Sequence, residues 1–174
     1  MNLKKYSAQR VEIYPVAGGS ENATLTLFIN RFNYGDNRVF DSRITQGGGS
    51  HLEHGFDDVP EFCHVDQRKL DDVVDGRQID VALLDTQGWG HEVLRWLRNT
   101  IQDRRLSILT EFVPTWLSDL GENPIEILKE YESWGYKLSS PDVPKDGPLS
   151  PTEVMEFLVD SGTYFLNVSL DSAV

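Results

Sequence analysis

The sequence predicts an α/β protein in which strands and helices alternate over most of the chain. Residues 79–84, IDVALL, form a nearly continuous apolar run, which is typical of a strand covered by helices on both faces of a parallel sheet. Apolar residues after Gly88 recur at helical spacing, and a second apolar run follows at residues 106–113. Strand, helix and strand in this order indicate a parallel βαβ unit, so we expect a mostly parallel sheet with helices packed on it.

The first 60 residues are predicted to form strands separated by turns. Three segments alternate between apolar and polar residues, as strands do: 11–17, 23–29 and 38–40. Two glycines, Gly18 and Gly19, end the first, and the turn-forming residues 33–37 separate the last two, which indicates a β-hairpin or an irregular meander. Residues 46–55 are rich in glycine and have no period, so we expect a loop there.

From residue 61 onward the pattern predicts five strands and four helices. The expected strands are residues 61–65, 79–84, 106–113, 136–138 and 163–170. The expected helices are marked by Asp66 as an N-cap with Leu70, Val73 and Val74 before Gly76, by Val93, Leu94, Leu97 and Ile101 after Gly88, and by capping boxes at residues 123–126 and 150–153. The last strand closes the predicted sheet.

Length and charge limit the classes of function. The chain has 174 residues, 16 basic and 28 acidic, with a formal charge of −12. A chain of this length buries roughly 70% of its unfolded surface, so we expect one domain spanning residues 1–174. The acidic balance, without a basic stripe, argues against a nucleic-acid partner. No apolar run approaches the ~18 residues of a membrane span or follows the basic N-terminus as in a signal peptide, so we expect no membrane partner and a cytoplasmic location.

The best candidate site lies at the strand-to-helix junction after residue 84. Asp85 stands at the carboxyl end of a buried strand, where ligands bind in open α/β sheets, and Gln87 shares its loop. The alternative is that Asp85 caps the next helix. Glu111 lies near the carboxyl end of the next strand, so both acids would open on one edge if the strands are neighbours. The alternative for Glu111 is a pair with Lys or Arg at the strand end.

Other constellations are weaker. His51, Glu53 and His54 are residue types that bind zinc, but their spacing matches no metal motif and their surroundings favour a solvated loop, so we predict no metal site there. His91 is expected to be an exposed or packing histidine. The sequence has no nucleophile elbow, no P-loop and no strand that runs into a glycine loop and a helix.

Several motifs stand along the chain in a fixed order. They are VEIYPVAGG at residues 11–19, NYGDNR at 33–38, LDD at 70–72, IDVALLDTQG at 79–88 with EVLR at 92–95 and LTEF at 109–112, and WGY at 134–136. In this order they resemble the FkbM-like family of S-adenosylmethionine-dependent methyltransferases. The resemblance implies an incomplete Rossmann-like class I methyltransferase sandwich, with an antiparallel C-terminal strand and a β-hairpin insertion.

The same resemblance implies roles for five residues. Asp85 would orient a methyl acceptor or take its proton, and Gln87 and Glu111 would line the acceptor side. Val16 and Ala17 would lie along the adenine of S-adenosylmethionine. The acceptor in such a protein is a sugar, a small-metabolite hydroxyl or another polar group.

Two departures from the family bear on activity. The family's first strand with its glycine turn, and the acid that ends its second strand, would both precede residue 11. The family also has an acid where this chain has Gly90. We therefore expect a complementing N-terminal half or a homo-oligomer to cover the exposed sheet edge. A non-catalytic binding or scaffold module is the alternative, and a metal-dependent hydrolase using His51, Glu53 and His54 is a third.

Overall fold

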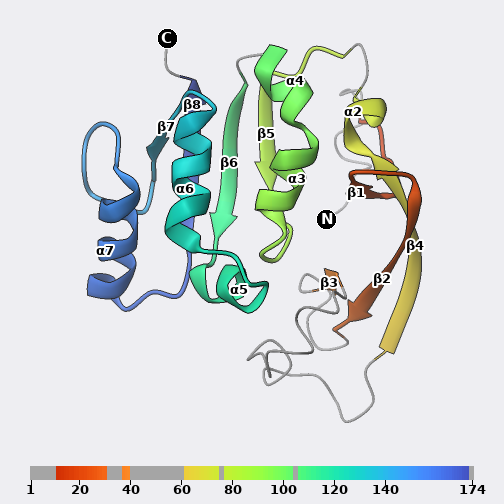
Figure 1. Ribbon diagram of the computed structural model, residues 1–174, viewed down its shortest axis with the longest axis horizontal. Helices are drawn as coiled ribbons and strands as arrows, with labels where there is room; N and C mark the ends of the chain where they lie inside the picture. The colour runs from red at the N-terminus through yellow and green to blue at the C-terminus, as the bar shows by residue number, and fades with distance from the viewer. Residues whose placement is uncertain (1–10, 31–36, 40–60, 75–76, 104–105, 173–174) are drawn as a thin grey trace.

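Two four-stranded sheets form the framework of the computed structural model, which describes residues 11–30, 37–39, 61–74, 77–103 and 106–172 (Figure 1). The strand orders are β1-β4-β2-β3 and β5-β6-β8-β7. Each sheet contains one parallel pair, β1 with β4 and β5 with β6, and its other pairs are antiparallel. The α/β class is confirmed, whereas the expected mostly parallel sheet is wrong.

The first sheet is built around its longest strand, β4. Its strands are β1 (Ala17–Gly19), β2 (Ala23–Ile29), β3 (Arg38–Val39) and β4 (Glu61–Lys69). β4 pairs with the whole of β2 in antiparallel register and with β1 in parallel register. The antiparallel pair of β2 and β3 confirms the predicted hairpin, and residues 31–36 and 40–60, with the expected 46–55 loop, lie outside the described residues.

Two expectations in this sheet are wrong. Residues 11–16 are not a strand, and β1 instead begins at Ala17 and contains both glycines that were expected to end it. The Val16 N–H donates a hydrogen bond to the Tyr14 carbonyl at 2.8 Å, so the chain makes a tight turn just before β1. Asp66 does not cap a helix, because it pairs with Thr24 of β2 and the parallel partner β1 carries β4 on to Lys69. The helix α2 (Leu70–Val73) starts only there.

The second sheet carries the predicted βαβ unit. Its strands are β5 (Val81–Leu84), β6 (Ser107–Phe112), β7 (Tyr136–Ser139) and β8 (Leu166–Ser172). β8 lies between β6 and β7 and is antiparallel to both, which confirms the antiparallel C-terminal strand. The strand predicted from residue 163 begins three residues later than expected.

Five further helices connect these strands. They are α3 (Gly90–Trp96), α4 (Arg98–Asp103), α5 (Pro114–Asp119), α6 (Pro124–Ser133) and α7 (Pro151–Ser161). The Ser150 capping box of α7 is present as predicted, and Asn123 caps α6 through the Ile125 N–H at 3.2 Å. Glu126, expected to complete a second capping box, instead accepts a hydrogen bond from Lys129 at 2.8 Å. The helix expected after Gly88 is divided at Leu97 into α3 and α4.

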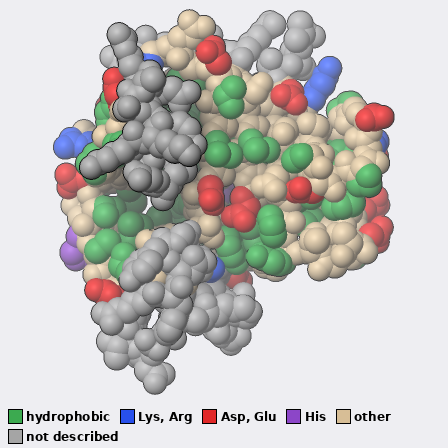
Figure 2. Space-filling model, turned by 180° about the vertical axis from the view of Figure 1, so that it is seen from behind, with side chains coloured by type: hydrophobic (Ala, Val, Ile, Leu, Met, Phe, Trp, Pro, Cys, Tyr) green, Lys and Arg blue, Asp and Glu red, His purple; other side chains and the backbone are tan. Residues whose placement is uncertain are grey.

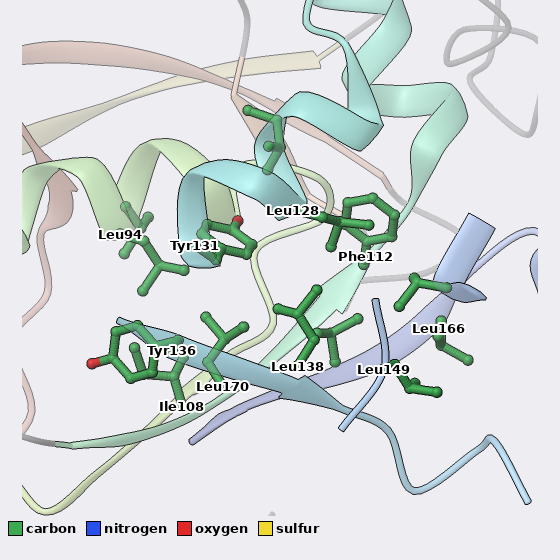
Figure 3. Close-up of a cluster of buried hydrophobic side chains, with 14 of the residues drawn as sticks. Leu94, Ile108, Phe112, Leu128, Tyr131, Tyr136, Leu138, Leu149, Leu166 and Leu170 are labelled. Carbon is green, nitrogen blue, oxygen red and sulfur yellow. The ribbon is translucent and has the colours of Figure 1, made fainter. Parts of the chain in front are cut away.

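The core lies between the second sheet and the helices α3, α4 and α6, which Figure 1 shows in front of it. Leu94, Leu128, Leu138 and Leu170 come from α3, α6, β7 and β8 and are fully buried (Figure 3). Burying such a side chain contributes about 1.5–3 kcal/mol, so these residues hold the helices against the second sheet.

The opposite face of β5 is exposed. Val81 and Leu83 retain 68% and 72% of their accessible surface, although the sequence predicted a strand covered on both faces. β5 is also the edge strand of its sheet. Figure 2, seen from behind, shows hydrophobic side chains at this surface with acidic side chains among them. Among the described residues, no helix is long and apolar enough to cross a membrane.

Candidate functional site

A tight loop from β5 to α3 holds two of the predicted site residues together. Gln87 Nε2 donates a hydrogen bond to Asp85 Oδ1 at 3.0 Å. Gln87 has φ = 50° and Gly88 has φ = 87°, so two successive residues are left-handed. For a glutamine this conformation costs about 1–3 kcal/mol, and such strain clusters at functional sites.

Asp85 does not cap the following helix. α3 begins at Gly90, and Trp89 occupies its N-cap position. The Trp89 N–H bonds to the Thr86 carbonyl at 3.1 Å, so the loop closes on its own backbone. The capping alternative is therefore wrong, and the Asp85 carboxylate is oriented by Gln87 instead.

Glu111 stands beside this pair on the neighbouring strand. Leu84 and Thr110 are partners in the parallel register of β5 and β6, so the next residues, Asp85 and Glu111, reach the same carboxyl edge. The condition that the two strands are neighbours is thus met. Thr110 is 2% exposed, and Glu111, which alternates with it, is half-buried. The edge therefore brings together two carboxylates and one amide, with Glu111 Oε2 buried. Groups of this kind can bind hydroxyl groups or accept a proton.

Gly90 lies close to Thr110 on the neighbouring strand. A Cβ atom at this position would lie 2.7 Å from Thr110 Oγ1. Any side chain here would force Thr110 or the start of α3 to shift. The Thr110 hydroxyl therefore occupies the space that a side chain at residue 90 would need.

The structure does not bring Val16 and Ala17 to this edge. Ala17 begins β1 in the first sheet, where it pairs with Gln67. A Cβ atom on Gly18 would lie 2.5 Å from Leu70, and one on Gly19 would lie 2.1 Å from the side chain of Gln67. The chain's own side chains therefore fill the space beside these two glycines.

Sequence reasoning missed an aromatic contact that supports the loop. Trp116, from α5, lies under Gly88, where an added Cβ would come within 2.9 Å of its ring. The Arg38 guanidinium, from β3, stacks 4.3 Å from the centre of the same ring. Such a cation–π contact contributes about 0.5–2 kcal/mol and joins the hairpin to the candidate site. The residues are 78 positions apart in the sequence, so no local pattern indicates the pair.

Of the histidines weighed in the sequence, the structure describes His91 but not His51 or His54. His91 is 3% exposed and its ring lies 6.3 Å from that of Trp89, so it is buried rather than exposed. His51, Glu53 and His54 lie outside the described residues.

Comparisons of this chain with protein-family models, with curated proteins and with solved structures found no match. Its function is therefore argued from the residues and their geometry.

Proposed function

We propose that this chain is the acceptor-binding part of an S-adenosylmethionine-dependent methyltransferase. The Asp85–Gln87 pair beside Glu111 carries the proposal, because oriented carboxylates at adjacent strand ends suit a polar acceptor. The acceptor class is a sugar or another small hydroxyl-bearing metabolite. The resemblance of residues 79–88 and 109–112 to the FkbM-like family supplies the reaction type.

The residues of this chain would bind the acceptor and handle its proton. Asp85 would accept a hydrogen bond from the acceptor hydroxyl, while Gln87 keeps the carboxylate in one orientation. Glu111 would contact a second hydroxyl from the adjacent strand end. A positioned general base typically contributes ~10²–10⁴-fold in rate, so Asp85 has the largest expected effect.

The cofactor would be held by a complementing segment or partner. The space beside Gly18 and Gly19 in β1 is filled by the side chains of Leu70 and Gln67, which supports placing the cofactor on another segment. The exposed edge and face of β5 support this part of the proposal, because an apolar strand of this kind pairs with another strand and is covered by a helix in a parallel sheet.

The packing around Gly18 and Gly19 also favours a second candidate. A module that binds a polar ligand at Asp85 without methyl transfer needs no adenosyl site, which agrees with the close packing of Leu70 and Gln67 against Gly18 and Gly19. This binding or scaffold module shares the same acceptor edge, so the cofactor distinguishes the two functions.

Ligand binding tests the shared edge directly. A panel of sugars and hydroxylated metabolites is screened against the full chain by ligand-observed NMR. We expect Asp85→Asn to abolish the signals of a bound ligand, since the swap keeps the shape but removes the charge. Asp80→Asn is the matched control, because Asp80 precedes the same strand and bonds to the exposed Gln78 at 3.2 Å. Equal binding by both variants would contradict the assigned site.

Calorimetry with S-adenosylmethionine separates the two candidates. The chain by itself is expected to bind the cofactor more weakly than micromolar, which corresponds to about −8 kcal/mol. Methyl transfer in a preparation completed by the cofactor-binding segment, lowered ~10²–10⁴-fold by Asp85→Asn, supports the methyltransferase. Micromolar or tighter binding by the chain alone would contradict our assignment of the cofactor site to another segment.

A further inference from the structure

A cluster of charged residues lies where α3, α6 and the turn between α5 and α6 meet. Arg95, on α3, bonds to Glu130 at 2.8 Å and to Glu122 at 3.1 Å, and approaches Glu92 at 3.4 Å. These side chains are only 15–30% exposed. Hydrogen bonding to Glu130, the largest cause, raises the pKa of Arg95, so the guanidinium stays charged.

The charges of this quartet do not balance. Three carboxylates share one guanidinium, which gives the four side chains a net charge of 1 − 3 = −2. Partial burial weakens solvent screening, so the mutual repulsion of the carboxylates is larger here than at an open surface. A divalent cation would neutralise the excess.

A buried imidazole adds a nitrogen donor to the same place. His91, on the first turn of α3, has a side chain that is 1% exposed, and its Nε2 lies 3.7 Å from Glu92 Oε1. The donor atoms of His91, Glu92 and Glu122 all lie within 4.8 Å of one another. Bonds of about 2.0–2.2 Å to zinc require these donor atoms to lie somewhat closer together. Side-chain rotations that move each donor atom by about an ångström bring them to this spacing.

We propose that His91, Glu92 and Glu122 bind a divalent transition-metal ion of the zinc class. One imidazole nitrogen and two carboxylate oxygens form a donor set that such ions accept, with a fourth position left for water. Arg95 keeps its contacts with Glu130, so the cluster with the ion has no net charge. The ion would tie the start of α3 to the turn before α6. This site does not depend on the proposed methyl transfer.

Zinc titration by calorimetry tests the site in the full chain. We expect one equivalent to bind, and Glu122→Gln to weaken the affinity at least about tenfold. Glu126→Gln is the matched control, because Glu126 lies close by in the sequence, is 60% exposed and bonds to Lys129. Since His91 is buried, His91→Ala is scored only after circular dichroism shows a native fold; Glu122→Gln does not depend on that result.

Two of the other three histidines, His51 and His54, provide the decisive comparison. The double variant His51→Ala/His54→Ala should keep its zinc affinity, whereas a site on residues 51–54 would lose it. Absence of binding at micromolar zinc, or binding that survives Glu122→Gln and disappears in the double variant, would overturn the proposal.

Discussion

Gln87 Nε2 donates to Asp85 Oδ1 at 3.0 Å from a backbone held at φ = 50°. The two features belong together, because the left-handed turn brings an amide two residues ahead back onto the carboxylate. The strained loop thus fixes the orientation of the acid before any ligand arrives.

Two replacements of Gln87 distinguish the backbone strain at this residue from the effect of its side-chain hydrogen bond on stability. Gln87→Gly should raise the free energy of unfolding by about 0.5–1 kcal/mol, since glycine adopts this backbone without strain but loses more entropy on folding. Gln87→Ala keeps the strain and should gain nothing. Urea unfolding of both variants measures the difference, and equal stabilities would show that the loop relaxes. Both variants should bind the acceptor more weakly.

Gly90 and Thr110 should be energetically coupled. Gly90→Ala places a Cβ 2.7 Å from Thr110 Oγ1, and overpacking of this kind costs about 1–3 kcal/mol. Thr110→Ala removes the clashing oxygen and should rescue part of the loss in the double variant. A double-mutant cycle from urea unfolding is expected to give a coupling of about 0.5–3 kcal/mol. Additive effects would mean that α3 moves away instead.

The exposed face of β5 should promote self-association. Leu83 is 72% exposed on an edge strand, and such strands recruit further strands. Light scattering at increasing concentration should show larger species for the wild type and fewer for Leu83→Lys. Val159→Lys is the control, because Val159 is 77% exposed on α7, away from that edge. A wild-type chain that stays monomeric would contradict this prediction.

Glu153 should titrate far below an ordinary glutamate. The hydrogen bond from Lys145 at 2.5 Å, followed by those from the Ser150 N–H and hydroxyl, lowers its pKa from 4.5 to about 2. A depressed pKa contributes stability above pH 4.5 that is lost as the pH falls towards 2. NMR titration should show Lys145→Met raising the pKa of Glu153, while Lys137→Met, on β7, leaves it unchanged.

The parts of the fold that sequence predicted are those with local signals. The βαβ unit around Asp85 follows from two apolar runs and the helical stripe of Val93 and Leu94 between them. The Ser150 capping box is specified within four residues. The nearness of Asp85 and Glu111 then follows from strand adjacency alone.

The parts that sequence missed depend on distant partners. The sequence of β4 predicts a strand followed by a cap at Asp66, but pairing with β2 continues to Gln67 and pairing with β1 extends the strand to Lys69. The Arg95 cluster joins residues 27 and 35 positions apart, which no periodicity can indicate. A strand with one exposed face and a strand covered on both faces can have the same apolar sequence. The exposure of Val81 and Leu83 on β5 therefore could not be inferred from the sequence.

The unequal burial of the two sheets has a consequence for local unfolding. Phe28 is the one apolar side chain of the first sheet that is buried, whereas the hydrophobic cluster of buried residues draws its members from the second sheet and its helices, within the described ranges. Amide protons of β2 and β4 should therefore exchange with deuterium through openings far smaller in free energy than those that release β6 and β8. A protease meeting the native chain would cut the first sheet before the second loses its structure, so degradation would start at that end.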